Sequence, residues 1–73
     1  DTKKREDQIL DLLVESYIRE SKPISSSYLC RYYKLLYSSA TVRNVMESLE
    51  KQGFLLHVYT SSGRVPTKIG FRH

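Results

Sequence analysis

The chain has few of the residues that build disulfide frameworks, metal cages or nucleotide-binding loops. Its 73 residues include one cysteine, Cys30, and two histidines, which supply neither an internal disulfide nor a zinc cage. No apolar run approaches the roughly 20 residues of a membrane-spanning helix. The charged amino end has no apolar leader segment, and no glycine-rich phosphate loop is present. These absences argue against secreted, membrane and nucleotide-binding proteins.

The small size limits the chain further. A chain this short buries only about 60% of its unfolded surface, which leaves room for three helices and a small sheet but no active-site cleft. The serine run at residues 25–27 has no nearby base and is typical of a helix cap. We therefore expect no enzyme, no cofactor and no metal, and a cytoplasmic location. Because the chain ends without a stop signal, we also expect it to be a piece of a longer protein.

Negative charge is scarce in the second part of the chain. Residues 1–20 carry four bases and six acids, whereas residues 21–73 carry eight bases and only Glu47 and Glu50 as acids. No acid follows Lys51. A basic surface confined to this part is typical of phosphate binding, although a solvated basic face gives the same pattern.

The apolar spacing predicts three helices and a hairpin. Helices are expected over residues 2–20, from Ser25 or Ser26 to residue 33, and over residues 38–52. A brief strand at residues 22–24 and a hairpin over residues 53–67 complete the prediction, with strands at 55–59 and 64–67. The fold class is mainly α (α+β): one domain, residues 1–73, with a three-helix winged helix-turn-helix and a two- or three-stranded antiparallel wing. In that architecture the third helix enters the DNA major groove.

The outer face of the third helix carries the predicted base contacts. Arg43 and Asn44 are residue types that bond guanine and adenine edges, and Glu47 can accept from a cytosine amino group. Ala40 can pack on a thymine methyl group. Any surface helix shows some of these residues, so the alternative is an ordinary solvent-exposed face with no role in binding.

Phosphate contacts are expected at both ends of that helix and from the wing. The free N–H groups at the helix start favour an anion beside Ser38, Ser39 and Thr41, although simple capping explains the same residues. Lys51 is the phosphate candidate of the last turn. Arg64 is expected at the hairpin tip, where it can enter a minor groove; the alternative is an exposed arginine that only solubilises the turn.

Two strings stand out, SSATVRN in the third helix and TSSGRVPT in the hairpin. With them, the segment from Pro23 to Arg72 resembles the amino-terminal domain of the bacterial heat-inducible transcription repressor HrcA. The matching positions are Pro23, Ser26, Leu29, Tyr33, Leu35, Ser38, Ala40, Thr41, Arg43, Asn44, Met46, Leu49, Glu50, Gly53, Leu55, Thr60, Ser61, Gly63, Arg64, Pro66, Thr67, Gly70 and Arg72.

The resemblance implies a homodimeric repressor of heat-shock chaperone operons. Members of that family bind an inverted-repeat operator, called CIRCE, and the chaperonin is implied as a partner. The larger carboxyl portion that carries dimerisation in the family is absent from this sequence. Several positions depart from the family pattern. Lys34 and Leu36 stand where glycine is common, so a non-glycine residue with positive φ is expected in the turn.

Two rival functions remain at this level. The first is a winged helix that uses the same face to bind another protein, with affinity that barely changes with salt. The second, more distant, is an enzyme domain. Six tyrosines also raise the idea of stacking on single-stranded bases, but Tyr17 and Tyr33 fall at predicted core positions.

Overall fold

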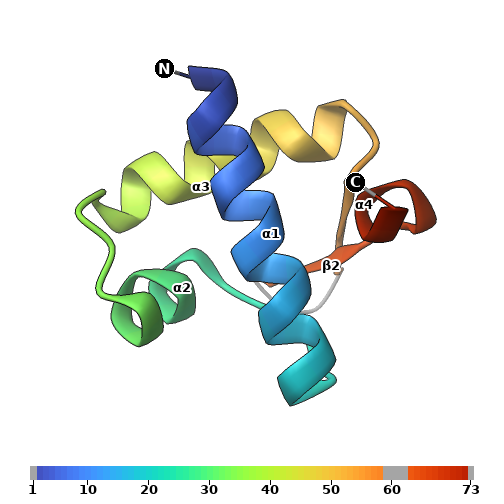
Figure 1. Cartoon of the computed structure of the whole chain (residues 1–73), viewed down its shortest axis with the longest axis horizontal. Helices are drawn as coiled ribbons and strands as arrows, with labels where there is room; N and C mark the ends of the chain where they lie inside the picture. The colour runs from blue at the N-terminus through green and yellow to red at the C-terminus, as the bar shows by residue number, and fades with distance from the viewer. Residues whose placement is uncertain (1, 59–62, 73) are drawn as a thin grey trace.

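The computed structural model describes residues 2–58 and 63–72, and within them it contains four helices and a two-stranded sheet. The order is α1 (Thr2–Glu20), α2 (Ser26–Tyr33), α3 (Ser39–Lys51), β1 (Leu55–His57), β2 (Arg64–Pro66) and α4 (Lys68–Arg72). In Figure 1, α1 crosses in front of α3, with α2 on one side and β2 and α4 on the other. The predicted fold class and the three long helices are confirmed, with bounds within one residue.

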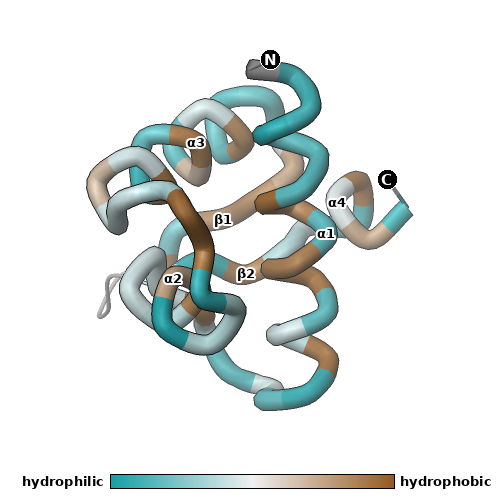
Figure 2. Tube along the Cα trace, turned by 60° about the vertical axis from the view of Figure 1, so that its left-hand side comes forward, coloured by the Kyte–Doolittle hydropathy of each residue, from teal (hydrophilic) through white to brown (hydrophobic). Residues whose placement is uncertain are grey.

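The core is built from apolar stripes of α1 and α3, together with Leu29 of α2, Ile24 and Leu55. The spacing of apolar residues at three and four positions places them on one face of a helix, and hydrophobic and hydrophilic segments alternate along α1 in Figure 2. The buried apolar residues are Ile9, Leu10, Leu13, Ile24, Leu29, Val42, Val45, Met46, Leu49 and Leu55. No helix in the described part of the chain has both the length and the apolar character needed to cross a bilayer.

The turn between α2 and α3 contains the expected left-handed residue. Ser25 caps α2 by accepting a hydrogen bond from the backbone N–H of Tyr28 at 3.1 Å. Lys34 ends α2 with a φ of 51°, a conformation that favours glycine. Leu35 then packs half-buried against the core, whereas Leu36 is fully exposed. The chain turns sharply here, and α3 then packs across α2.

The wing is an antiparallel pair in which Leu55 lies opposite Pro66 and His57 opposite Arg64. The strand expected at residues 22–24 is reduced to one antiparallel bridge: the Ile24 N–H donates to the Arg64 carbonyl at 3.0 Å, and the Arg64 N–H donates to the Ile24 carbonyl at 2.8 Å. The expected first strand extended to Tyr59, but β1 ends at His57. Tyr59 and the predicted turn at residues 60–62 lie outside the described residues.

Helix α4 was not predicted from the sequence. It begins after Thr67, whose hydroxyl donates to the Gly53 carbonyl at 2.6 Å and accepts from the Gly70 N–H at 3.2 Å. Gly70 is buried against the backbone carbonyl of Phe54, and a Cβ at this position would collide with it. The short helix therefore closes the wing onto the segment that follows α3, through contacts that local sequence patterns do not reveal.

Candidate nucleic-acid interface

Helix α3 presents the predicted outer face to solvent. Its buried stripe consists of Val42, Val45, Met46 and Leu49. On the other side, Ala40, Arg43, Asn44 and Glu47 are all exposed. The prediction that these four side chains point outward is therefore confirmed. The face mixes a guanidinium, an amide, a carboxylate and a methyl group, which are the groups that read base edges in a major groove.

The start of α3 has the geometry expected of a helix cap. Ser38 has extended backbone angles, and its hydroxyl accepts from the Thr41 N–H at 3.2 Å and lies 3.1 Å from the Thr41 hydroxyl. Ser38 and Ser39 are exposed and Thr41 is half-buried, while Lys51 is exposed in the last turn. Capping accounts for Ser38, and the four candidate phosphate contacts lie on the accessible surface.

Two shallow grooves flank α3. On the α2 side, a polar groove is lined by Ser25, Ser26, Ser27, Ser39, Ala40 and Arg43, so the starts of α2 and α3 lie together. On the α1 side, a second groove is lined by Arg5, Glu6, Thr41, Asn44, Val45 and Ser48. The second groove was missed by sequence reasoning because α1 carries a net negative charge and gave no signal of a binding surface.

The acid of the second groove is engaged with α3. Glu6 accepts from the Ser48 hydroxyl at 2.7 Å and from the Gln52 side-chain amide at 3.3 Å. The hydrogen bond from Ser48, followed by that from Gln52, lowers the pKa of the Glu6 carboxyl. This contact fixes the amino-terminal part of α1 against α3.

Arg64 does not occupy the predicted position at the wing tip. The residue is only 8% exposed, and its Nε donates to the Glu50 carboxylate at 3.0 Å. Its backbone is bridged to Ile24. The prediction of an exposed arginine was wrong because the Arg64 side chain points to Glu50 of α3, while its backbone pairs with Ile24 and the preceding Gly63 packs against Pro23. Arg64 ties β2 to α3 and is not presented to solvent.

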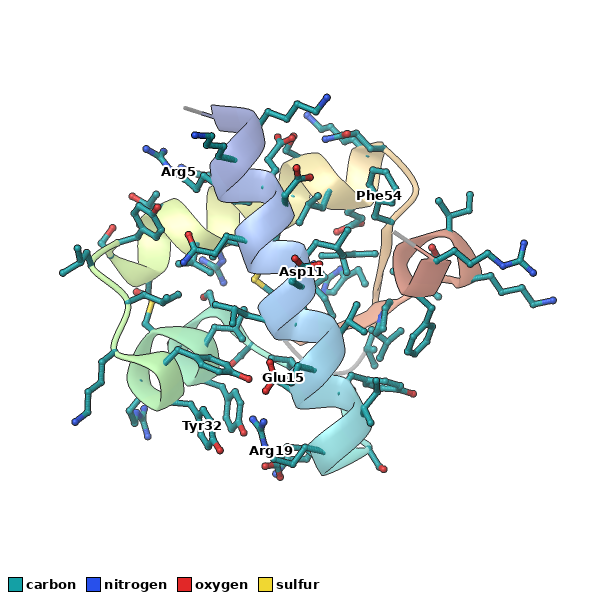
Figure 3. The ribbon with its side chains drawn as sticks, in the orientation of Figure 1. Arg5, Asp11, Glu15, Arg19, Tyr32 and Phe54 are labelled. Atoms are coloured by element: carbon teal, nitrogen blue, oxygen red, sulfur yellow. The ribbon has the colours of Figure 1, made fainter. Side chains whose placement is uncertain are left out.

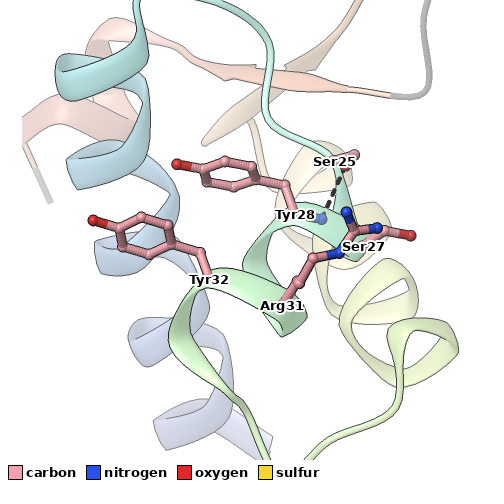
Figure 4. A pocket seen from close by; sticks show the side chains of 5 residues that line it. All are labelled: Ser25, Ser27, Tyr28, Arg31 and Tyr32. Carbon is pink, nitrogen blue, oxygen red and sulfur yellow. Dashed lines mark hydrogen bonds between the residues drawn. The ribbon is translucent and has the colours of Figure 1, made fainter.

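The exposed side of α2 carries a cluster of tyrosines that already contact other side chains of the protein. The rings of Tyr28 and Tyr32 stack with centroids 5.5 Å apart (Figure 4). Arg19 donates to the Tyr28 hydroxyl at 2.9 Å and lies 4.1 Å from the Tyr32 ring centroid, and the Tyr28 hydroxyl donates to Glu20 at 2.9 Å. The bonds to Tyr28 and then Tyr33 raise the pKa of Arg19. The cluster fastens α2 to the end of α1.

Three helices with a sharp turn between the second and third, followed by an antiparallel hairpin, define a winged helix-turn-helix domain. A crystal structure of a hypothetical protein at 2.2 Å resolution has the same fold, with a TM-score of 0.88 and 40% identity over 93% of this chain and 22% of that one. A search against protein-family models finds no match.

The particular relatives are heat-inducible transcription repressors named HrcA. The chain is 48% identical over 69 residues to HrcA of Chlorobium chlorochromatii and 46% identical over 70 residues to HrcA of Mycoplasma mobile, covering 94% and 96% of this chain. It spans about a fifth of the length of these curated relatives, 20% and 21%. These matches confirm the resemblance to the HrcA repressors over nearly the whole of this chain.

Proposed function

We propose that this chain is the DNA-binding domain of a bacterial transcription repressor and binds double-stranded DNA sequence-specifically. The observation that carries the proposal is the exposed polar face of α3, which lies opposite its buried stripe and has an accessible, capped start. The names of the relatives support repression as the outcome of binding. The operon class, heat-shock chaperone genes, and the CIRCE-type inverted repeat come from the same resemblance.

The assignment of roles follows the geometry of α3. Ala40, Arg43, Asn44 and Glu47 contact base edges, and Ser38, Ser39, Thr41 and Lys51 contact phosphates. An inverted repeat requires a two-fold protein, so the longer protein acts as a homodimer in the bacterial cytoplasm, and the isolated domain binds one half-site weakly. The chaperonin is the regulatory partner that the resemblance implies for the whole protein.

Fluorescence anisotropy with two duplexes tests the proposal. One duplex carries the CIRCE inverted repeat and the other has the same bases in scrambled order. The chain should prefer the inverted repeat, and the affinity for both duplexes should fall steeply as salt rises. A protein-binding winged helix, the main rival, would show no salt-dependent DNA affinity under the same conditions.

Arg43→Ala separates base reading from charge. We expect a loss of about 1–3 kcal/mol in binding to the inverted repeat, with relaxed preference at one base pair. Arg72→Ala, which removes an exposed arginine from α4, is the matched control and should leave that preference unchanged. An equal loss on both duplexes for Arg43→Ala would contradict a role in base recognition.

A further inference from the structure

Arg5 lies beside the recognition helix although it belongs to α1. Its guanidinium carbon is 5.0 Å from the centroid of the Tyr37 ring, in the residues that lead into α3. The Tyr37 hydroxyl donates to Gln8 at 3.3 Å, which holds the ring against α1. Arg5 lines the same groove as Thr41 and Asn44, and Figure 3 shows it at the end of α1 near the amino-terminal half of α3.

The hydrogen-bonding capacity of Arg5 is not used within the described residues. Its Nε is buried and has no hydrogen-bond partner there, and no carboxylate lies within ion-pair distance. The carboxylate of the neighbouring acid, Glu6, accepts hydrogen bonds from Ser48 and Gln52 instead. By contrast, Arg19 and Arg64 are paired with Glu20 and Glu50. A buried donor without a partner is unfavourable. The Nε–H is closed to solvent, but Arg5 as a residue is only half-buried, so an acceptor supplied from outside would approach the terminal nitrogens of its guanidinium.

The dimensions of DNA indicate what that acceptor is. A helix with its side chains is about 10–12 Å across, and the major groove is about 12 Å wide. When a helix fills the groove, the two sugar-phosphate backbones therefore run along its two flanks. A planar guanidinium on one flank matches phosphate oxygens in geometry and charge.

We propose that Arg5 of α1 contacts a DNA backbone phosphate on the flank of α3 that bears Thr41 and Asn44. This inference rests on the proposed DNA-binding function and adds a contact from outside the helix-turn-helix. The ring of Tyr37 positions the guanidinium before DNA arrives. Because a phosphate carries no sequence information, Arg5 contributes affinity and leaves base preference unchanged.

The test measures the salt dependence of binding of the 73-residue chain to the CIRCE duplex and its scrambled counterpart. Arg5→Gln should weaken binding to both duplexes by the same factor, about fivefold, and reduce the slope of log affinity against log salt by about 0.9. Arg72→Gln, the matched loss of charge on α4, should leave the slope unchanged. Arg5→Lys retains the charge and should retain the slope.

A second measurement uses the unsubstituted chain and does not depend on the folding of a variant. The Arg5 Nε–H resonance should shift when the duplex is added and should not shift with sodium chloride alone. An unmoved resonance, or an unchanged slope for folded Arg5→Gln, overturns the role of Arg5 while leaving the proposed function intact. Absence of salt-dependent binding by the unsubstituted chain overturns both.

Discussion

Arg64→Met is expected to destabilise this domain while leaving the DNA affinity of the folded protein nearly unchanged. The Arg64 side chain is 9% exposed, and its Nε lies 3.0 Å from a Glu50 carboxylate that is 36% exposed. Hydrogen bonds to charged groups contribute about 1.5–3 kcal/mol, and solvent at Glu50 screens part of this. Methionine retains much of the buried volume. The expected loss in the free energy of unfolding is therefore about 1–2 kcal/mol.

Removing the other partner should cost more. Glu50→Ala leaves a buried guanidinium without its carboxylate, whereas Arg64→Met leaves a carboxylate that water reaches. Breaking a fully buried pair in this direction costs about 3–5 kcal/mol, and the exposure of Glu50 reduces our expectation to about 2–3 kcal/mol. In a domain of this size, 1 kcal/mol corresponds to a change in Tm of about 4–8 °C, so both variants should be resolved in thermal melts.

Urea unfolding followed by circular dichroism measures these differences, and DNA titration of the folded variants measures affinity. Glu47→Ala is the control because Glu47 is an exposed acid on the same helix, and its stability should stay within about 0.5 kcal/mol of the parent. If Arg64→Met were as stable as the parent but bound DNA more weakly, Arg64 would be a wing contact and the burial argument would be refuted.

Three further changes test local features of the fold. Ser38→Ala removes the acceptor of the Thr41 N–H and should lower the free energy of unfolding by about 1 kcal/mol in urea; an unchanged value would mean that the cap contributes nothing. Lys34→Gly relieves a φ of 51° and should raise stability by about 0.5–1 kcal/mol; a decrease would contradict backbone strain. For Glu6, the bond from Ser48 lowers the folded-state pKa below 4.5, so its stabilisation is present above that pH and is lost as the pH falls through the folded pKa. Between about pH 6 and about pH 3, the Tm of Glu6→Gln should therefore fall less than that of the parent. An equal fall in Tm for the two proteins would exclude this contribution.

Local sequence patterns were sufficient for the three long helices. The stripe of α3 repeats at helical spacing, Ser25 and Ser38 are cap residues, and Gly53, with a φ of 89°, follows the carboxyl end of α3. The comparison with the family pattern pointed to a left-handed residue at Lys34 or Leu36, and the structure has it at Lys34. Each of these features depends on residues within a few positions of one another, and backbone sterics and amphipathic spacing determine them without reference to the rest of the chain.

The sequence by itself thus determined that the three long helices form and which side of α3 faces water, because amphipathic spacing and caps are local features. Only the tertiary structure decided that Arg64 is buried against Glu50, that Gly70 packs on Phe54 to close the wing, and that Arg5 and Asn44 line one groove. These facts join residues that are 14, 16 and 39 positions apart in the sequence. The exposure of a charged side chain depends on such distant packing, and a local pattern carries no information about it.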